Sequence, residues 1–235
     1  MTTSRGLPTT PTRRPSGTMV PAAGERRSIR ANADEAPVAV PAAGTALLLI
    51  DVINDLAFDG SDALVAQAEG MAATLARLKR RVTAAGVPAI YINDNFGQWR
   101  SDFRRTVAHC TARSSPGQRV SRRLRPTARD YFVLKPKHSG FFDTTLDTLL
   151  ETLGVRRLIL TGIAGNICVL FTANDAYMRE YKIFAPSDCI VSNTAVDNDH
   201  ALRQIAIVLK GNVAASTRLR FHASGRTARR RARAE

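Results

Sequence analysis

The sequence predicts an α/β fold: a doubly wound three-layer sandwich around a parallel, Rossmann-like sheet. Short, β-branched apolar runs alternate along the chain with longer segments in which apolar residues recur at helical spacing. That alternation is typical of strand–helix–strand units, which build parallel sheets. Three of the apolar runs also lead into residues that carry chemistry, Asp51, Lys135 and Cys168. Because the carboxyl ends of parallel strands line one crevice, this fold would bring the three side chains together.

The first half of the domain is predicted to hold two strands, a long helix and a polar insertion. Ala46–Asp51 is a continuous apolar run, as expected of a buried strand. Asp62–Ala85 has the apolar spacing of a helix, and the Gly and Pro that follow end it. Pro88–Asn93 is the second predicted strand. The Arg-rich segment Asp94–Arg129 comes next, with a short helix near Phe103–Cys110.

The second half continues the alternation. Tyr131–Lys135 is the third predicted strand and Arg157–Thr161 the fourth. The remaining predicted elements are helices at Thr144–Leu153, Asn166–Glu180 and Ala195–Leu209, and final strands at Lys182–Ala185 and Gly211–Ala214.

We expect one domain over residues 44–217, with a disordered tail on each side, 1–43 and 218–235. The 235 residues are 44% apolar, enough to bury a full core. The net charge of +14 is concentrated outside that core: +3 in residues 1–44, +8 in 100–129, +6 in 218–235, and −3 in the rest. Tails rich in Arg and small polar residues cannot bury enough apolar surface to fold. The basic charge therefore belongs to the two ends and one insertion.

Composition also indicates the cellular compartment of the protein. The sequence has neither an apolar segment of 18 residues nor a signal-peptide core, so we expect no membrane span. Three cysteines without metal-like spacing suit a reducing cytoplasm rather than a disulfide framework. We therefore expect a cytoplasmic protein.

The segment TGIAGNICVLFTANDA, residues 161–176, carries the strongest functional signal. It places Cys168 after a β-branched run and a Gly-rich bend, where a helix should begin. The positive end of a helix dipole favours a reactive thiolate. Glycine-rich dinucleotide and phosphate-binding motifs are missing from the sequence, as is the serine-hydrolase elbow. The sequence therefore indicates nucleophilic chemistry at a cysteine.

Three blocks resemble the isochorismatase-like cysteine hydrolases, which include nicotinamidases, carbamoylsarcosine amidases and ureidoacrylate amidases. The blocks are ALLLIDVINDLAF, VLKPKHSGFFDTTLDTLL and LILTGIAGNICVLFTANDAY, in the order and with the spacing of that family. The resemblance extends from about residue 44 to about residue 216. It implies a six-stranded parallel sheet, a homo-oligomer and a small-molecule substrate.

The resemblance also implies roles for particular residues. Asp51 matches the catalytic acid, Lys135 the lysine and Cys168 the nucleophile of an Asp–Lys–Cys triad. The family's oxyanion hole matches the backbone N–H groups of Ala164 and Cys168, with a cis peptide at Ile163–Ala164. In this mechanism Asp51 takes the thiol proton and passes it to the departing amine, while Lys135 lowers the pKa of both neighbours. Cys168 forms a thioester that water hydrolyses.

Several assignments have competitors. Charge alone does not separate Lys137 from Lys135, although the resemblance favours Lys135. Asp55 and Asp94 are interpreted as cap or turn residues, and Cys110 and Cys189 as inert core.

Substrate contacts are predicted in two regions. Phe141 is either pocket lining or core, and Asn166 begins the helix that carries the nucleophile. Trp99 and Arg100 belong to a polar segment that could form a specificity lid, in which Arg100, Arg104 or Arg105 would bind a carboxylate. A solvated basic loop is the equal alternative for that segment.

Departures from the family limit the substrate. Nicotinamidases carry an Asp-x-His pair and further metal-binding histidines after the second strand, where this chain has NDNFGQW. The four histidines of the chain are His109, His138, His200 and His222. We therefore expect neither a metal nor another cofactor. Many relatives carry Thr where this chain has Gly165, which would open the pocket floor or loosen the bend.

Three function classes follow. The leading one is a metal-independent amidase that cleaves a C–N bond of a small amide, ureide or carbamoyl compound. The second is isochorismatase-type hydrolysis of a vinyl ether, which is less favoured because isochorismatases do not rely on a cysteine nucleophile. The third is a basic interaction protein whose tail RTARRRAR binds nucleic acid. That tail lacks interleaved aromatic residues, so we do not expect nucleic acid to be a partner.

Overall fold

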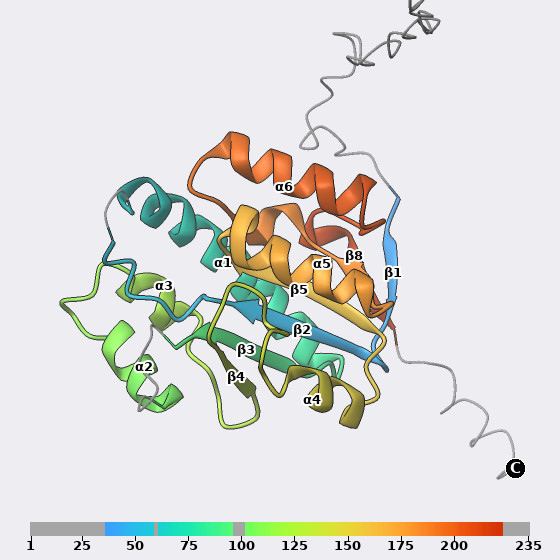
Figure 1. Ribbon diagram of the computed structural model, residues 1–235, viewed down its shortest axis with the longest axis horizontal. Helices are drawn as coiled ribbons and strands as arrows, with labels where there is room; N and C mark the ends of the chain where they lie inside the picture. Colours follow the sequence, from blue (N-terminus) through green and yellow to red (C-terminus); the bar gives the residue numbers. More distant parts are fainter. Residues whose placement is uncertain (1–35, 59–60, 96–101, 223–235) are drawn as a thin grey trace, which may run out of the picture.

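A computed structural model describes residues 36–58, 61–95 and 102–222 (Figure 1). They form the predicted α/β sandwich around a six-stranded sheet of order β4-β3-β2-β5-β6, with β7 also paired to β5. All of its strand pairs are parallel, so the predicted fold class is confirmed. The strands are β2 Thr45–Ile50, β3 Ala89–Asp94, β4 Tyr131–Lys135, β5 Arg157–Ile163, β6 Lys182–Phe184 and β7 Ile190–Val191.

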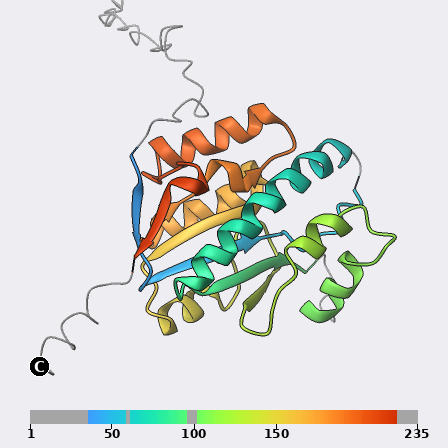
Figure 2. The same cartoon turned by 180° about the vertical axis from the view of Figure 1, so that it is seen from behind.

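Helices cover both faces of the sheet (Figures 1 and 2). The α-helices are α1 Asp62–Ala84, α2 Phe103–Cys110, α3 Gln118–Arg123, α4 Leu146–Thr152, α5 Leu170–Met178 and α6 Ala195–Ile207. Short turns of other helical types lie at Gly165–Val169, Ser187–Cys189 and Ser216–Arg218. No helix among the described residues is long and apolar enough to cross a membrane.

The central strand β2 shows why the sheet is buried on both sides. All six of its residues are buried. Leu47 and Leu49 belong to the core cluster shared with α1, α2 and α3, whereas Leu48 and Ile50 belong to the cluster shared with α4, α5 and α6. Side chains alternate between the two faces of a strand, so a strand in the middle layer must be apolar throughout. This continuous run made β2 predictable.

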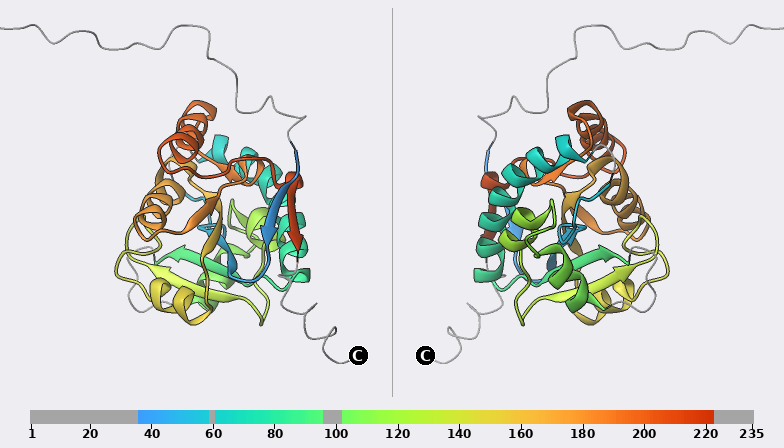
Figure 3. Two further views of the ribbon diagram at one scale, coloured as in Figure 1. Left: turned by 90° about the vertical axis from the view of Figure 1, so that its right-hand side faces the viewer. Right: turned by 90° about the vertical axis from the view of Figure 1, so that its left-hand side faces the viewer.

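The domain extends beyond the predicted limits of 44 and 217. Strand β1 (Val38–Pro41) pairs in parallel with β8 (Leu219–His222), forming a second, two-stranded sheet (Figure 3). Val40 and Leu219 are fully buried. Arg81 of α1 donates to the carbonyl oxygens of Ser216 at 2.9 Å and of Leu219. The predicted tails therefore began a few residues too early at one end and ended too late at the other, because a strand of four residues is not recognisable in the sequence without its partner. Residues 1–35 and 223–235 lie outside the described residues.

Two further elements differ from the sequence prediction. Gly211–Ala214 is not a strand, since it makes only an isolated bridge from Asn212 to Phe184. Strand β7, which pairs with β5, was not predicted from the sequence. The helix predicted from Asn166 begins as a π turn at Gly165–Val169 and becomes α-helical at Leu170. Cys168 therefore lies in an irregular turn rather than at a regular helix start.

Candidate active site

The carboxyl edge of the sheet brings the three predicted triad residues together. Asp51 directly follows β2, Lys135 ends β4, and Cys168 lies in the π turn after β5. The Nζ atom of Lys135 is 2.9 Å from Asp51 Oδ2 and 3.5 Å from Cys168 Sγ. One ammonium group thus contacts both a carboxylate and a thiol.

The backbone fixes Asp51 before any substrate arrives. Its φ of 49° lies in the left-handed region, which an aspartate tolerates better than most residues. The Asp51 N–H donates to Ile92 O at 2.8 Å, and its Oδ1 accepts from the Asp94 N–H at 2.7 Å. Asp51 is only 5% exposed and Lys135 is fully buried, so packing and hydrogen bonds fix the positions of both side chains.

Asp94 is a site residue that the sequence analysis missed. Its Oδ2 lies 3.5 Å from Lys135 Nζ, so the lysine lies between two carboxylates. We had interpreted Asp94 as a cap or turn residue. The signal was nevertheless available, because β3 and β4 are parallel neighbours and Asp94 pairs in register with Lys135. An acidic residue at the carboxyl end of this neighbouring strand is therefore expected to lie close to Lys135.

Burial controls the ionisation of the triad. Desolvation raises the pKa of Asp51 despite the opposing charge of Lys135. Burial also acts on Lys135, but the negative groups around it, led by Asp51, outweigh burial and raise its pKa. For Cys168, burial and then the charge of Asp51 raise the thiol pKa to about 12, more than Lys135 lowers it.

Burial and Asp51 therefore both disfavour the thiolate form of Cys168. Lys135 lowers the pKa of the thiol, as expected from the sequence, but burial and Asp51 raise it by more. The reason is that Cys168 shares its buried site with a carboxylate, whose negative charge opposes a second negative charge nearby.

Glycines allow the chain to turn sharply before Cys168. A Cβ atom on Gly162, whose φ is +116°, would lie 2.0 Å from the backbone oxygen of Ile50. A Cβ on Gly165 would lie 2.6 Å from Asn198 Oδ1 and 2.7 Å from Ser192 Oγ. Gly165 therefore leaves no open pocket floor, because those side chains occupy the space.

The segment around the predicted oxyanion hole is held from both sides. The Ile163–Ala164 peptide is cis, and Ala164 O accepts from the N–H groups of Ile167 and Val169, each at 3.1 Å. The Asn166 N–H donates to Ser192 Oγ at 3.0 Å. Within the described chain, the buried Oδ1 of Asn166 has no hydrogen-bond partner, which leaves one acceptor beside the nucleophile's turn.

The other residues considered for the site from the sequence lie in different environments. Phe141 is only 4% exposed and belongs to the core, with its ring near Tyr181 and beneath Arg179. Of the two alternatives for Phe141, these contacts favour the core, where the phenylalanine packs between the sheet and the helices. Trp99 and Arg100 lie outside the described residues. Lys137 is exposed beyond the end of β4, which separates it from Lys135.

The other two cysteines are buried. Burial, followed by the charge of Asp55, raises the pKa of Cys110 to about 12. Burial, followed by the charge of Asp188, also raises the pKa of Cys189. Both fit the predicted role of inert core thiols.

His138 is a further neighbour of the nucleophile that the sequence analysis did not select. Its Nδ1 lies 3.9 Å from Cys168 Sγ, and its ring centroid lies 5.4 Å from that of Phe171. Both residues are exposed, whereas Asp51 and Lys135 are buried. Each follows a triad residue by three positions along the chain.

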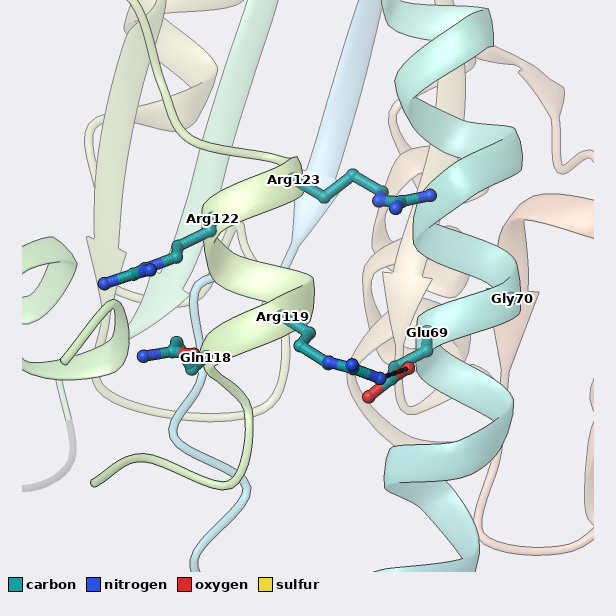
Figure 4. A pocket seen from close by; sticks show the side chains of 6 residues that line it. All are labelled: Glu69, Gly70, Gln118, Arg119, Arg122 and Arg123. Atoms are coloured by element: carbon teal, nitrogen blue, oxygen red, sulfur yellow. Dashed lines mark hydrogen bonds and ion pairs between the residues drawn. The ribbon is translucent and has the colours of Figure 1, made fainter. Parts of the chain in front are cut away.

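No cluster of three or more His, Cys, Asp or Glu that could hold a metal occurs in the part of the chain that the structure describes. A basic cavity of about 750 Å³ lies between α1 and α3, where Arg119 donates to Glu69 at 3.2 Å (Figure 4). A second cavity, of about 1040 Å³, borders the start of β4. Neither cavity is lined by Asp51, Lys135 or Cys168.

Comparisons with known proteins agree with this geometry. The isochorismatase domain model matches residues 45–218, and the chain belongs to that family. An uncharacterized isochorismatase family protein, YaaI of Bacillus subtilis, is 47% identical over 71% of this chain and 91% of its own length. The ureidoacrylate amidohydrolase RutB of Yersinia enterocolitica is 31% identical over 64% of this chain and 76% of its own length.

A solved structure extends the similarity. The N-carbamoylsarcosine amidase of Thermoplasma acidophilum superposes with a TM-score of 0.57 at 25% identity, covering 73% of this chain and 96% of that one. The predicted family and enzyme class are thereby confirmed: the protein is an isochorismatase-family hydrolase with amidohydrolase relatives.

Proposed function

We propose that this protein is a cysteine amidohydrolase that cleaves a C–N bond of a small amide, ureide or carbamoyl compound through a thioester on Cys168. The observation that carries the proposal is the contact of Lys135 Nζ with both Asp51 Oδ2, at 2.9 Å, and Cys168 Sγ, at 3.5 Å. Relatives named as a ureidoacrylate amidohydrolase and an N-carbamoylsarcosine amidase act on bonds of this kind.

The first half of the reaction forms the thioester. As Sγ attacks the carbonyl carbon, the thiol proton passes to the Asp51 carboxylate, because the thiol itself stays neutral until then. The negative charge that develops on the carbonyl oxygen is stabilised by the backbone N–H groups of Ala164 and Cys168. Asp51 then returns the proton to the nitrogen, the C–N bond breaks and the amine leaves.

The second half releases the acid. A water molecule attacks the thioester carbon while Asp51 takes one of its protons, and collapse of the tetrahedral intermediate expels the Cys168 thiolate, which regains the proton from Asp51. Lys135 keeps its positive charge throughout, since neighbouring carboxylates raise its pKa. It offsets the negative charge that moves between Asp51 and Cys168, so the site never holds two uncompensated anions.

Ammonia or amine release from a panel of amides, ureides and carbamoyl compounds tests the proposal. We expect turnover of at least one class and complete inactivation by stoichiometric alkylation of Cys168. Turnover of a vinyl ether with no amide cleaved would favour the isochorismatase-type reaction. Catalysis that survives alkylation of Cys168 would contradict the nucleophile.

We further propose that the protein acts as a homo-oligomer in the cytoplasm. Its three cysteines are free thiols in the structure, as suits a reducing compartment. Light scattering of the purified protein tests the assembly, and a single monomeric mass at micromolar concentration would contradict it.

A further inference from the structure

We propose that Ser192 and Asn198 are positioning residues for the nucleophile: Ser192 caps the turn that carries Cys168, and Asn198 orients the Ser192 hydroxyl. This inference rests on the proposed function, because it concerns the turn on which that reaction depends.

The turn of Cys168 needs a hydrogen-bond acceptor at its start. The first N–H groups of a helical turn have no partner within the turn, and a polar side chain at the N-cap usually accepts from one of them. Here the N-cap is Ala164, whose methyl group cannot accept a hydrogen bond. The acceptor comes from the segment that follows β7, since the Asn166 N–H donates to Ser192 Oγ at 3.0 Å. Ser192 thus caps the turn from outside it.

This cap fixes the part of the turn that the chemistry uses. The segment is a π turn, in which the Val169 N–H donates to Ala164 O at 3.1 Å. Such turns are rare and frequently occur at functional sites. Asn166 lies midway in the sequence between Ala164 and Cys168, whose N–H groups are the proposed oxyanion donors. The bond to Ser192 therefore holds the middle of the segment that carries both donors.

Asn198 determines the direction of the Ser192 hydroxyl. Ser192 Oγ accepts from a backbone N–H, so its single proton is available for Asn198 Oδ1, which lies 3.0 Å away. Asn198 is oriented in turn by its Nδ2, which donates to Ile190 O at 3.4 Å. Ser192 is 0% exposed and Asn198 is 6% exposed, so both side chains are shielded from competing water.

The backbone of the turn lies directly against this pair. A Cβ atom on Gly165 would lie 2.6 Å from Asn198 Oδ1 and 2.7 Å from Ser192 Oγ. No side chain can therefore stand between the turn and the pair, and a movement of either residue reaches the turn. Oxyanion donors are effective only while their positions are held, and a misplacement of about 1 Å can lower a rate by about 100-fold.

The test compares Ser192→Ala and Asn198→Ala, alone and combined, with Ser121→Ala. Ser121 is the matched control because it is also 0% exposed, and its Oγ accepts from the Asn54 N–H at 3.2 Å and donates to Asn54 O at 3.1 Å. Hydrogen exchange of the Asn166 amide, followed by NMR, measures the cap directly. The values of kcat and KM for an amide that the wild type cleaves measure its effect on the reaction, and thermal unfolding measures stability.

In Ser192→Ala the Asn166 N–H loses its acceptor, so its exchange should accelerate by about tenfold. The value of kcat should fall by about 10- to 100-fold with KM within about threefold, because the donors act on the transition state. Asn198→Ala should shift exchange and kcat in the same directions by smaller factors. The double variant should match Ser192→Ala within about threefold, since Asn198 acts through Ser192. Ser121→Ala should lower the Tm comparably, with exchange and kcat within about threefold of the wild type.

Unchanged exchange of the Asn166 amide in Ser192→Ala would overturn the inference. Equal losses of kcat in Ser192→Ala and Ser121→Ala would also overturn it, because general destabilisation would then explain both. Additive losses in the double variant would overturn the role of Asn198. If Ser192→Ala does not fold, Asn198→Ala decides the question, since unchanged exchange and kcat in that variant contradict the inference.

A wild type that cleaves no amide would count against the proposed function alone. The exchange measurement needs no substrate, so it still decides whether Ser192 caps the turn.

Discussion

Replacing Asp51 by Asn should separate turnover from ionisation of the nucleophile. Turnover should vanish, because no group remains to accept the thiol proton and return it to the leaving nitrogen. The Cys168 thiol should nevertheless ionise more easily, because the Asp51 charge helps burial to raise its pKa to about 12. Lys135 would still lie beside Sγ, at 3.5 Å in the native geometry, and would keep Asp94 as a partner.

The magnitude follows from the charges. Two unit charges about 4 Å apart interact by roughly 4 kcal/mol at an effective dielectric constant of about 20, or about three pKa units. Because a charged neighbour within about 4–6 Å shifts a pKa in proteins by about 1–3 units, we expect the thiol pKa to fall by about one to two units. Nucleophilicity also falls with pKa, with a Brønsted coefficient of about 0.4–0.5. Alkylation of Cys168 near neutral pH should therefore accelerate by about 3- to 10-fold.

The assay measures the second-order rate of iodoacetamide addition to the Cys168 peptide between pH 6.5 and 10. Asp147→Asn is the control, since this carboxylate pairs with Arg179 on the surface. Circular dichroism should show that both variants are folded. Slower or unchanged alkylation in Asp51→Asn would refute the account of the raised thiol pKa, and retained turnover would refute the role of Asp51 as the base.

Three further predictions concern stability, pH and the domain limits. Lys135→Met should leave Asp51 buried without a cation beside it and lower the free energy of unfolding in urea by about 3–5 kcal/mol. Lys137→Met, at an exposed position, should change that free energy by less than about 0.5 kcal/mol. Equal effects of the two substitutions would contradict the assignment of Lys135 as the partner of Asp51. In the proposed mechanism Asp51 must be a carboxylate, and burial raises its pKa above the usual 3.8. As the pH falls, kcat/KM should therefore begin to decline at a pH above 3.8. A decline that begins only below pH 3.8 would show that Asp51 is not the titrating base. Trimming to residues 36–222 should preserve activity. Trimming to 40–217 removes β8 with the buried Leu219 and should lower the free energy of unfolding, measured by thermal unfolding, by at least about 2 kcal/mol. Equal stability of the two forms would show that the β1–β8 sheet does not contribute to stability.

The sequence could predict the central strands because their burial leaves a local pattern. The apolar run of β2 and the chemistry-bearing ends of β2 and β4 suffice to place Asp51 and Lys135 at one edge of a parallel sheet. The peripheral pair β1–β8 leaves no such pattern. Its strands are four residues long and lie at opposite ends of the domain's sequence, so neither is recognisable in the sequence without its partner.

The electrostatics of the site were less predictable than its residues. Helix dipole and lysine charge suggested a thiolate at Cys168, but the thiol pKa depends on how deeply the sulfur is buried and how close Asp51 lies. Both are tertiary properties. The sequence left the role of Phe141 open for a related reason, since a phenylalanine between a strand end and a helix packs into the core as readily as into a pocket.

The most direct test of the central claim is the rate of amine or ammonia release by Cys168→Ala, measured on whichever amide the wild type turns over. Removing a nucleophile from a hydrolase typically lowers kcat by at least about 10⁴-fold. We predict a loss of that size, with circular dichroism and thermal unfolding close to those of the wild type. A folded Cys168→Ala variant that keeps a rate within about tenfold of the wild type would contradict the cysteine mechanism.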